Sequence, residues 1–304
     1  MKAKEPKNVA ASVRQRLLNK RDDEHRPFDE LLQYYAMERF LYRLSKSPYR
    51  QKFILKGALL LRIWNVMDSR PTMDIDMLGK IGNDPQVLES AFKEICGIEV
   101  DGDGLVFDPK SVKSEQITKE ADYVGTRILF QAKLENARIH MQIDIGFGDS
   151  TFPPPIEMEM PTILGQKAPY IIGYRMETSI AEKLHAMVEL SDLNSRMKDF
   201  HDIWTLARQF DFDGPSLALA ISNTFESRSK SVPQKIDAFS PEFAVLKQTQ
   251  WQSFRKRFRT TTAPEDFAQT VALIQRFLGP PVNAISNGNS FSLKWKHPDN
   301  WERV

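Results

Sequence analysis

The sequence predicts an α/β (α+β) protein with two lobes, a first lobe built on a small mixed sheet and a second that is mainly helical. Residues 73–78 and 137–147 alternate apolar with polar side chains, as half-buried strands do. Four prolines fall within residues 153–161, which marks a linker. After this linker the apolar residues recur at helical spacing. We therefore expect the lobes to occupy residues 1–155 and 156–304.

The elements of the first lobe follow from local patterns. Helical spacing of apolar residues or a helix-starting signal occurs in four segments, 8–21, 28–46, 56–64 and 84–96. The segments 123–134 and 137–147 flank the two-residue turn Glu135-Asn136, which predicts a β-hairpin. Asp144 then lies on the polar face of the second hairpin strand.

The second lobe shows helical signals throughout. Ser179, with Glu182 three residues later, forms a capping-box pattern and predicts a helix start. Further helices are predicted over 195–210, 216–228 and 264–278. The C-terminal residues after 278 show no period that predicts an element.

Composition limits the classes of protein to consider. The chain has 304 residues and a formal net charge of +2, so its total charge does not favour nucleic acid and any basic surface must be local. The single cysteine, Cys96, cannot form an internal disulfide or a multi-cysteine zinc site. Neither a signal peptide nor a long apolar run is present. We therefore expect a cytoplasmic protein without a membrane span.

Asp74 and Asp76 carry the clearest chemical signal. Two residues apart in a strand, they project from one face with Cα atoms about 7 Å apart, and their charges repel unless a cation lies between them. Mg²⁺ prefers such oxygen ligands and combines them with substrate phosphates. With Asp144 as a third carboxylate and Gly57 at a helix start, the pattern favours nucleotidyl transfer. The alternative is the solvated face of an edge strand.

The stretch "FILKGALLLRIW…RPTMDIDML" resembles the opening of the AbiEii family, which is also typified by MenT. These proteins are nucleotidyltransferases of the DNA polymerase β superfamily and act as toxins of bacterial toxin–antitoxin pairs. The matching motifs are Lys56-Gly57-Ala58, Arg70-Pro71-Thr72-Met73-Asp74-Ile75-Asp76, Glu182-Lys183 and Lys198-Asp199-Phe200-His201-Asp202. Ala58 departs from the family pattern, where relatives have glycine or serine, so a serine hydroxyl for the triphosphate is absent.

The resemblance implies a nucleotidyltransferase-like first lobe and a helical lobe that closes the cleft. It implies a catalytic set of Asp74, Asp76, Asp144, Lys183, Asp199 and Asp202. Mg²⁺ or Mn²⁺ would be held by Asp74, Asp76 and Asp144, and the nucleoside triphosphate would be bound by Lys56, Gly57, Ala58, Arg62, Arg70, Thr72 and Lys183. The sequence does not choose between Asp199 and Asp202 as the active-site carboxylate.

By the same resemblance, the acceptor is RNA, expected to be the 3′ end of tRNA, the outcome is growth arrest in abortive infection, and a separately encoded antitoxin is the partner. Two alternatives stay open: a non-catalytic module that binds nucleotide or a partner, and a nucleotidyltransferase that modifies a protein or small molecule. A basic segment adds a nucleic-acid-binding candidate made of Arg255, Lys256, Arg257 and Arg259. Its aromatic residues have helical spacing, so a core-facing amphipathic helix is the competing interpretation.

Overall fold

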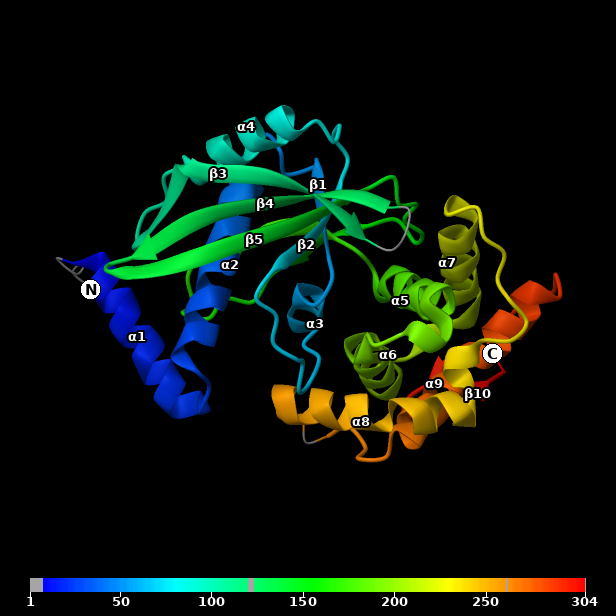
Figure 1. The fold of residues 1–304 in the computed structure, drawn as a ribbon. Helices are drawn as coiled ribbons and strands as arrows, with labels where there is room; N and C mark the ends of the chain where they lie inside the picture. Colours follow the sequence, from blue (N-terminus) through cyan, green and yellow to red (C-terminus); the bar gives the residue numbers. More distant parts are fainter. Residues whose placement is uncertain (1–7, 120–122, 261, 304) are drawn as a thin grey trace. The chain divides into compact units, whose positions relative to one another are not determined.

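The computed structural model describes residues 8–119, 123–260 and 262–303 of the chain. They divide into two compact units (Figure 1). The first unit comprises Met1–Trp64, Pro71–Gly148 and Ile156–Gly173, and the second comprises Asn65–Arg70, Asp149–Pro155 and Tyr174–Val304. The first contains a mixed sheet and the second is mainly helical, so the predicted α/β fold class is confirmed.

The first unit is built on a seven-stranded sheet of order β3-β4-β5-β2-β1-β7-β6. Its strands are β1 (Phe53–Lys56), β2 (Ile75–Gly79), β3 (Leu105–Lys119), β4 (Tyr123–Leu134), β5 (Ala137–Phe147), β6 (Ile156–Glu159) and β7 (Tyr170–Gly173). β2 runs parallel to β5 and antiparallel to β1. β4 and β5 form the predicted hairpin, with Leu134 opposite Ala137 across the turn.

Helices cover one face of this sheet. They are α1 (Val9–Glu24), α2 (Phe28–Lys46), α3 (Leu59–Ile63) and α4 (Pro85–Cys96). α2 and α4 lie against the same side of β3, β4 and β5 (Figure 1). The core between them is aromatic, because Phe40 of α2 stacks on Phe92 and also meets Phe107 and Phe130. The opposite face of the sheet carries polar side chains, as the alternation in β5 predicts.

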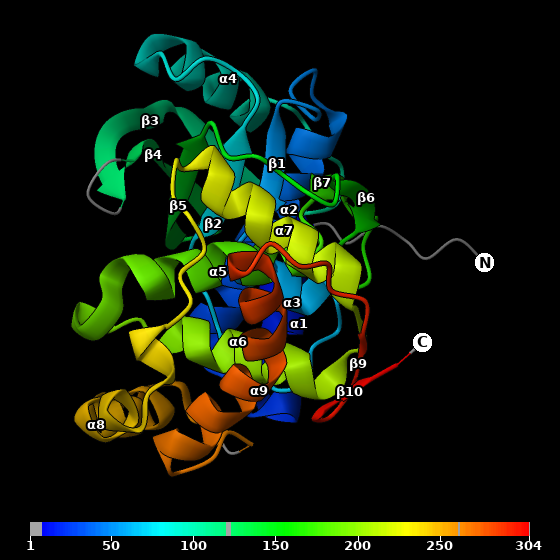
Figure 2. The same cartoon turned by 90° about the vertical axis from the view of Figure 1, so that its right-hand side faces the viewer.

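The second unit packs helices around a second aromatic core. It contains α5 (Met176–Leu190), η1 (Ser191–Leu193), α6 (Met197–Gln209), α7 (Gly214–Ser227), η2 (Asp237–Phe239), α8 (Pro241–Phe258) and α9 (Phe267–Ser286). A small sheet joins β8 (Phe212–Asp213), β9 (Lys294–Lys296) and β10 (Asn300–Glu302). Phe200 of α6 stacks on Phe243 and meets Phe267 edge-on, which ties α6 to α8 and α9. Figure 2 shows α5 and α7 side by side.

Three predicted helix boundaries are wrong. Lys56 ends β1, and Gly57 and Ala58 form a turn before α3 begins at Leu59. Ser179 does not cap α5, which starts at Met176. α9 continues past Leu278 through two prolines, since Val282 still packs into the core beyond them. At these three positions, tertiary packing outweighs the helix-capping and helix-breaking signals in the local sequence.

Other differences concern strands. β2 begins at Ile75, so Met73 precedes the strand and its side chain is exposed, although the alternation placed it with the buried residues. β3 begins at Leu105 in a stretch where turn residues dominate, and it is not predicted. The predicted linker contains β6, which pairs with β7 in the sheet of the first unit (Figure 2). No helix within the described ranges is both long and apolar enough to cross a membrane.

Candidate active site

A row of charged residues crosses five neighbouring strands of the first unit. Lys56 of β1 is the register partner of Asp76 in β2, Asp76 of Asp144 in β5, and Asp144 of Arg127 in β4. Arg127 is in turn opposite Glu115 of β3. Residues in register on adjacent strands point to the same face. The row therefore sets two carboxylates side by side, with one cation beyond each of them.

Arg127 holds Asp144 in a bidentate ion pair. Its Nε donates to one carboxylate oxygen at 2.8 Å and its second terminal nitrogen donates to the other at 3.0 Å. The hydrogen bond to Asp144 raises the pKa of Arg127, and the charges of Asp144, Glu115 and Asp74 act in the same direction. Asp74, although it precedes β2, is therefore near enough to act on this arginine. Asp144 itself is almost fully buried.

Gly57 lies directly against the Asp76 carboxylate. Its φ is +75°, in the left-handed region that favours glycine. A Cβ at this position would meet Asp76 Oδ2 at 2.3 Å, too close for any side chain. The glycine of the Lys-Gly motif is thus explained by the approach of a carboxylate to the backbone. Ala58 follows it, nearly buried, and gives α3 no side-chain cap.

The loop that carries Asp74 is fixed by side chains of α2. The Tyr34 hydroxyl accepts a hydrogen bond from the Thr72 backbone N–H at 3.0 Å. Thr72 Oγ1 then donates to Asp74 Oδ1 at 2.6 Å. Gln33 donates to the Met73 carbonyl at 3.0 Å. Arg62 stacks over the Tyr34 ring, 4.3 Å from its centre, so it supports the tyrosine that orients this loop.

Asp74 and Asp76 are chemically suited to a divalent cation. Both are only half-buried, and Mg²⁺ commonly uses one or two protein carboxylates together with substrate phosphates. Across residues 8–119, 123–260 and 262–303, no group of three or more His, Cys, Asp or Glu side chains is arranged as a complete metal cage. A pair of carboxylates such as Asp74 and Asp76 is the protein share of a Mg²⁺ site that the phosphates of a nucleotide complete.

The second unit contains a separate cluster of buried charges. Lys183 of α5 donates to Asp199 at 2.7 Å and to Asp202 at 2.8 Å, both on α6. Arg70 forms a bidentate pair with Asp202 at 2.9 and 3.0 Å. Arg196 donates to Asp199 at 2.6 Å. Both aspartates are buried.

The charges in this cluster stabilise one another against burial. Burial opposes ionisation, yet the charges of Asp199 and Asp202 raise the pKa of Lys183. Burial likewise acts against Asp202, while Arg70 and Lys183 hold its pKa well below the usual range. Lys183 uses two of its three N–H donors on Asp199 and Asp202.

A sequence profile decides the family. The profile described as nucleotidyl transferase AbiEii toxin of a Type IV toxin–antitoxin system matches residues 39–273. The chain belongs to the AbiEii family. It is therefore a nucleotidyltransferase of a toxin family, and the predicted family membership is confirmed. The matched range includes every carboxylate of the charged row and the whole buried cluster.

No curated protein matches the chain. The crystal structure of JHP933 from Helicobacter pylori is similar with a TM-score of 0.49 and 14% identity, over 85% of this chain and 95% of that one. A second Helicobacter pylori structure, of a protein provisionally assigned as a nucleotidyltransferase, gives a TM-score of 0.46 and 14% identity over the same shares.

The basic segment of α8 differs from a stacking platform for bases. Trp251 and Phe254 are buried and stack on one another, with ring centres 5.4 Å apart. Arg255 forms an ion pair with Glu265 at 3.7 Å, and its Nε donates a hydrogen bond to the Ala263 carbonyl oxygen. Trp251 and Phe254 therefore belong to the core, as the competing interpretation predicts, whereas Phe258 is half-buried. The remaining cations of the segment, Lys256, Arg257 and Arg259, are exposed.

Three residues of the candidate active site were not predicted from the sequence. Arg127 was predictable, because a two-residue turn at 135–136 fixes the hairpin register and places Arg127 opposite Asp144. Tyr34 and Gln33 were not, since their helical spacing is that of core residues. Their contacts to the Asp74 loop arise only when α2 packs on the sheet.

Proposed function

We propose that this AbiEii-family nucleotidyltransferase uses Mg²⁺ or Mn²⁺ to add nucleotides from a nucleoside triphosphate to RNA, at the 3′ end of tRNA. The observation that carries this proposal is the placement of Asp76 beside Asp144, with Asp74 close by. When bound, the metal supplies a Lewis acid that neutralises charge on the triphosphate. Asp74 and Asp76 would hold it, with Thr72 and Gly57 keeping both carboxylates in position.

Asp144 is proposed to act in the transfer beside its pairing with Arg127. Besides the two bonds from Arg127, its Oδ1 accepts from the Gln142 side-chain amide at 3.3 Å. Under this proposal Asp144 accepts a hydrogen bond from the attacking hydroxyl, or binds a second cation, while Arg127 keeps its orientation. Proton removal from the hydroxyl and stabilisation of the leaving pyrophosphate are the two demands of such a transfer. Lys56 and Arg62 add positive charge in the same unit.

Lys183 is proposed as a second phosphate contact. Its ammonium is fixed by Asp199 and Asp202, and it carries a third N–H that we propose for the phosphate. Under this proposal both aspartates orient Lys183 and Arg70 rather than contact the metal. Lys183→Ala should raise the KM for nucleotide, and Lys198→Ala, which alters an exposed neighbour, should not.

The test is direct. Purified protein is incubated with each labelled nucleoside triphosphate, Mg²⁺ and total RNA, and label in RNA, protein and small molecules is separated. We expect label in RNA, and its loss in Asp74→Ala and Asp76→Ala at unchanged far-UV circular dichroism. Label in a protein or small-molecule fraction would replace the RNA acceptor with that class. No transfer at all would support the non-catalytic alternative.

The biological part of the proposal has its own test. AbiEii proteins are toxins of toxin–antitoxin pairs, so a separately encoded antitoxin is the expected partner. Expression of the chain alone should slow bacterial growth, and Asp76→Ala should relieve the effect at equal protein level. Equal growth with both proteins would refute the toxic role and leave the enzymatic proposal intact.

A further inference from the structure

We infer that the open face of β3, β4 and β5 binds a single strand of the RNA acceptor, leading its end toward Asp144 and Asp76; this inference rests on the proposed function. The face is the one that carries the charged row, opposite the side covered by α2 and α4. Along β5, Arg138 lies six residues before Asp144, roughly 20 Å at strand spacing. That length accommodates a few nucleotides of an extended strand.

Cations without anionic partners mark this face. Lys133 of β4 is directly opposite Arg138 of β5, and Lys113 of β3 lies on the same face further toward the charged row. All three are exposed, and within the described ranges none of them has an ion-pair partner. Like charges directly opposite one another destabilise a sheet. A bound phosphate backbone would relieve the repulsion between Lys133 and Arg138.

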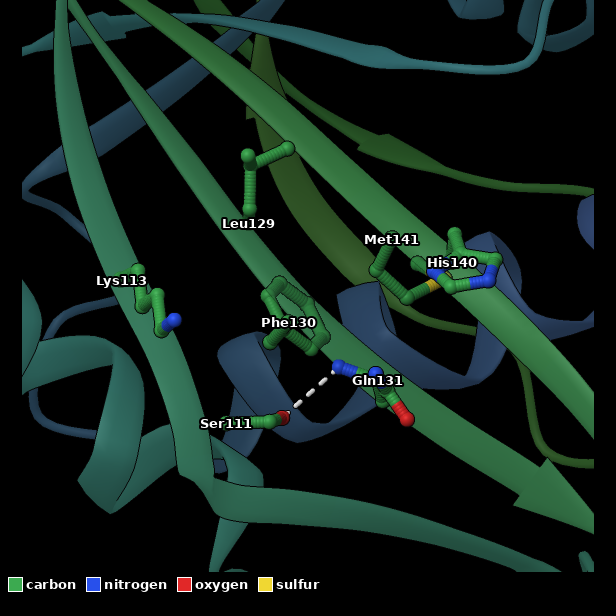
Figure 3. Close-up of a pocket in the computed structure, with 7 residues that line it drawn as sticks. All are labelled: Ser111, Lys113, Leu129, Phe130, Gln131, His140 and Met141. Carbon is green, nitrogen blue, oxygen red and sulfur yellow. Dashed lines mark hydrogen bonds between the residues drawn. The ribbon is translucent and has the colours of Figure 1, made fainter.

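A hollow in the same face is suited to a base. It has a volume of about 390 Å³ and lies where β3 shifts register between Asp108 and Lys113. Figure 3 shows its residues arriving from three neighbouring strands. Ser111 is held in the bulge, since its hydroxyl donates to the Asp108 carbonyl and accepts from the Gln131 backbone N–H. The bulge between Asp108 and Lys113 thus helps to form the hollow.

The lining of the hollow is mainly apolar, which suits stacking, and it includes the Gln131 side chain. His140 is exposed and presents an aromatic ring, and Leu129 adds an apolar surface on the neighbouring strand. Within the described part of the chain, the Gln131 side-chain amide makes no hydrogen bond, so its donor and acceptor can face a base edge. Unstacked bases of single-stranded RNA are recognised by such aromatic surfaces and by amides. An acidic protein segment could form ion pairs with Lys113 and Lys133 but would not stack on the His140 ring.

The experiment measures binding of a fluorescein-labelled oligouridylate by anisotropy, with the full chain and without nucleotide or metal, at several salt concentrations. Lys133→Gln/Arg138→Gln is compared with Lys52→Gln/Lys80→Gln, a matched pair of exposed lysines at the β1–β2 end of the sheet. Each phosphate contact to single-stranded nucleic acid contributes about 0.7 to the salt slope of log K, so the first variant should lower the slope by about 1.4. The control should keep it unchanged.

His140→Ala separates a base from a plain polyanion. It should weaken oligouridylate binding roughly tenfold with an unchanged salt slope, and should not alter binding of labelled poly-glutamate. Equal effects of the two double variants, or a His140→Ala protein with wild-type affinity, would overturn the inference. So would tighter binding of poly-glutamate than of RNA, which would assign the face to an acidic protein. Because these measurements need no turnover, they stand even if nucleotide transfer to RNA is not found.

Discussion

Gly57→Ala tests how the backbone supports the candidate active site. The added Cβ would lie 2.3 Å from Asp76 Oδ2, whereas ordinary contacts begin at 3.4 Å. The carboxylate must therefore retreat by about 1 Å, a misplacement that can cost on the order of 10²-fold in rate. The left-handed backbone at φ +75° adds strain of about 1–2 kcal/mol against any side chain.

Gly102→Ala is a matched control for the strain alone. Gly102 has φ +74°, but an added Cβ would have nothing within 4 Å. Both variants should lose about 1–2 kcal/mol of unfolding free energy in urea titrations. Only Gly57→Ala should also lose about 10²-fold in kcat/KM for labelled nucleotide transfer. Equal activity of the two variants would refute the reasoning that Gly57 positions Asp76.

Three further predictions concern charge and burial. Arg127→Gln leaves the buried carboxylate of Asp144 without its bidentate partner and should lower the unfolding free energy by about 1–3 kcal/mol, measured in urea. Burial, together with Arg228, lowers the pKa of His185 to about 4, below its unfolded value of about 6.5, so stability should fall by about 1.4 kcal/mol per pH unit between those values as pH decreases. His185→Asn should abolish that slope; a retained slope would assign it to other groups. Burial raises the pKa of Cys96 to about 12, so a thiol reagent at pH 8 should label it only after unfolding, and rapid native labelling would contradict its burial.

The sequence was sufficient for elements whose local pattern is strong. The β4–β5 hairpin follows from alternation on both sides of a two-residue turn, and with it the register that places Asp144. The helix over α4 follows from Asp84, whose carboxylate accepts from the N–H groups of Gln86 and Val87 as a cap should. Asp74 and Asp76 were recognisable because two carboxylates one residue apart in an apolar stretch repel each other unless a cation lies between them.

The rest depends on contacts between distant segments. α2 is buried around its whole circumference, including Glu38 and Arg43, which no apolar period predicts. Their partners come from elsewhere: Glu38 accepts from the Ile163 backbone N–H, and Arg43 donates to Asp103 at 2.6 Å. The burial of Asp202 likewise requires Arg70, far away in the chain. Such pairs become visible only once the fold brings their elements together.

Calorimetry tests most directly whether Asp74 and Asp76 hold the metal that supports nucleotide binding. A non-hydrolysable nucleoside triphosphate is titrated into the protein with and without Mn²⁺, for the wild type, Asp74→Asn, Asp76→Asn and the exposed control Asp101→Asn. We predict that Mn²⁺ strengthens nucleotide binding in the wild type and in Asp101→Asn, and that each of the other two variants loses this gain while keeping its melting temperature. The same Mn²⁺-dependent gain in Asp74→Asn and Asp76→Asn as in the wild type would contradict the assignment of the metal to these two carboxylates.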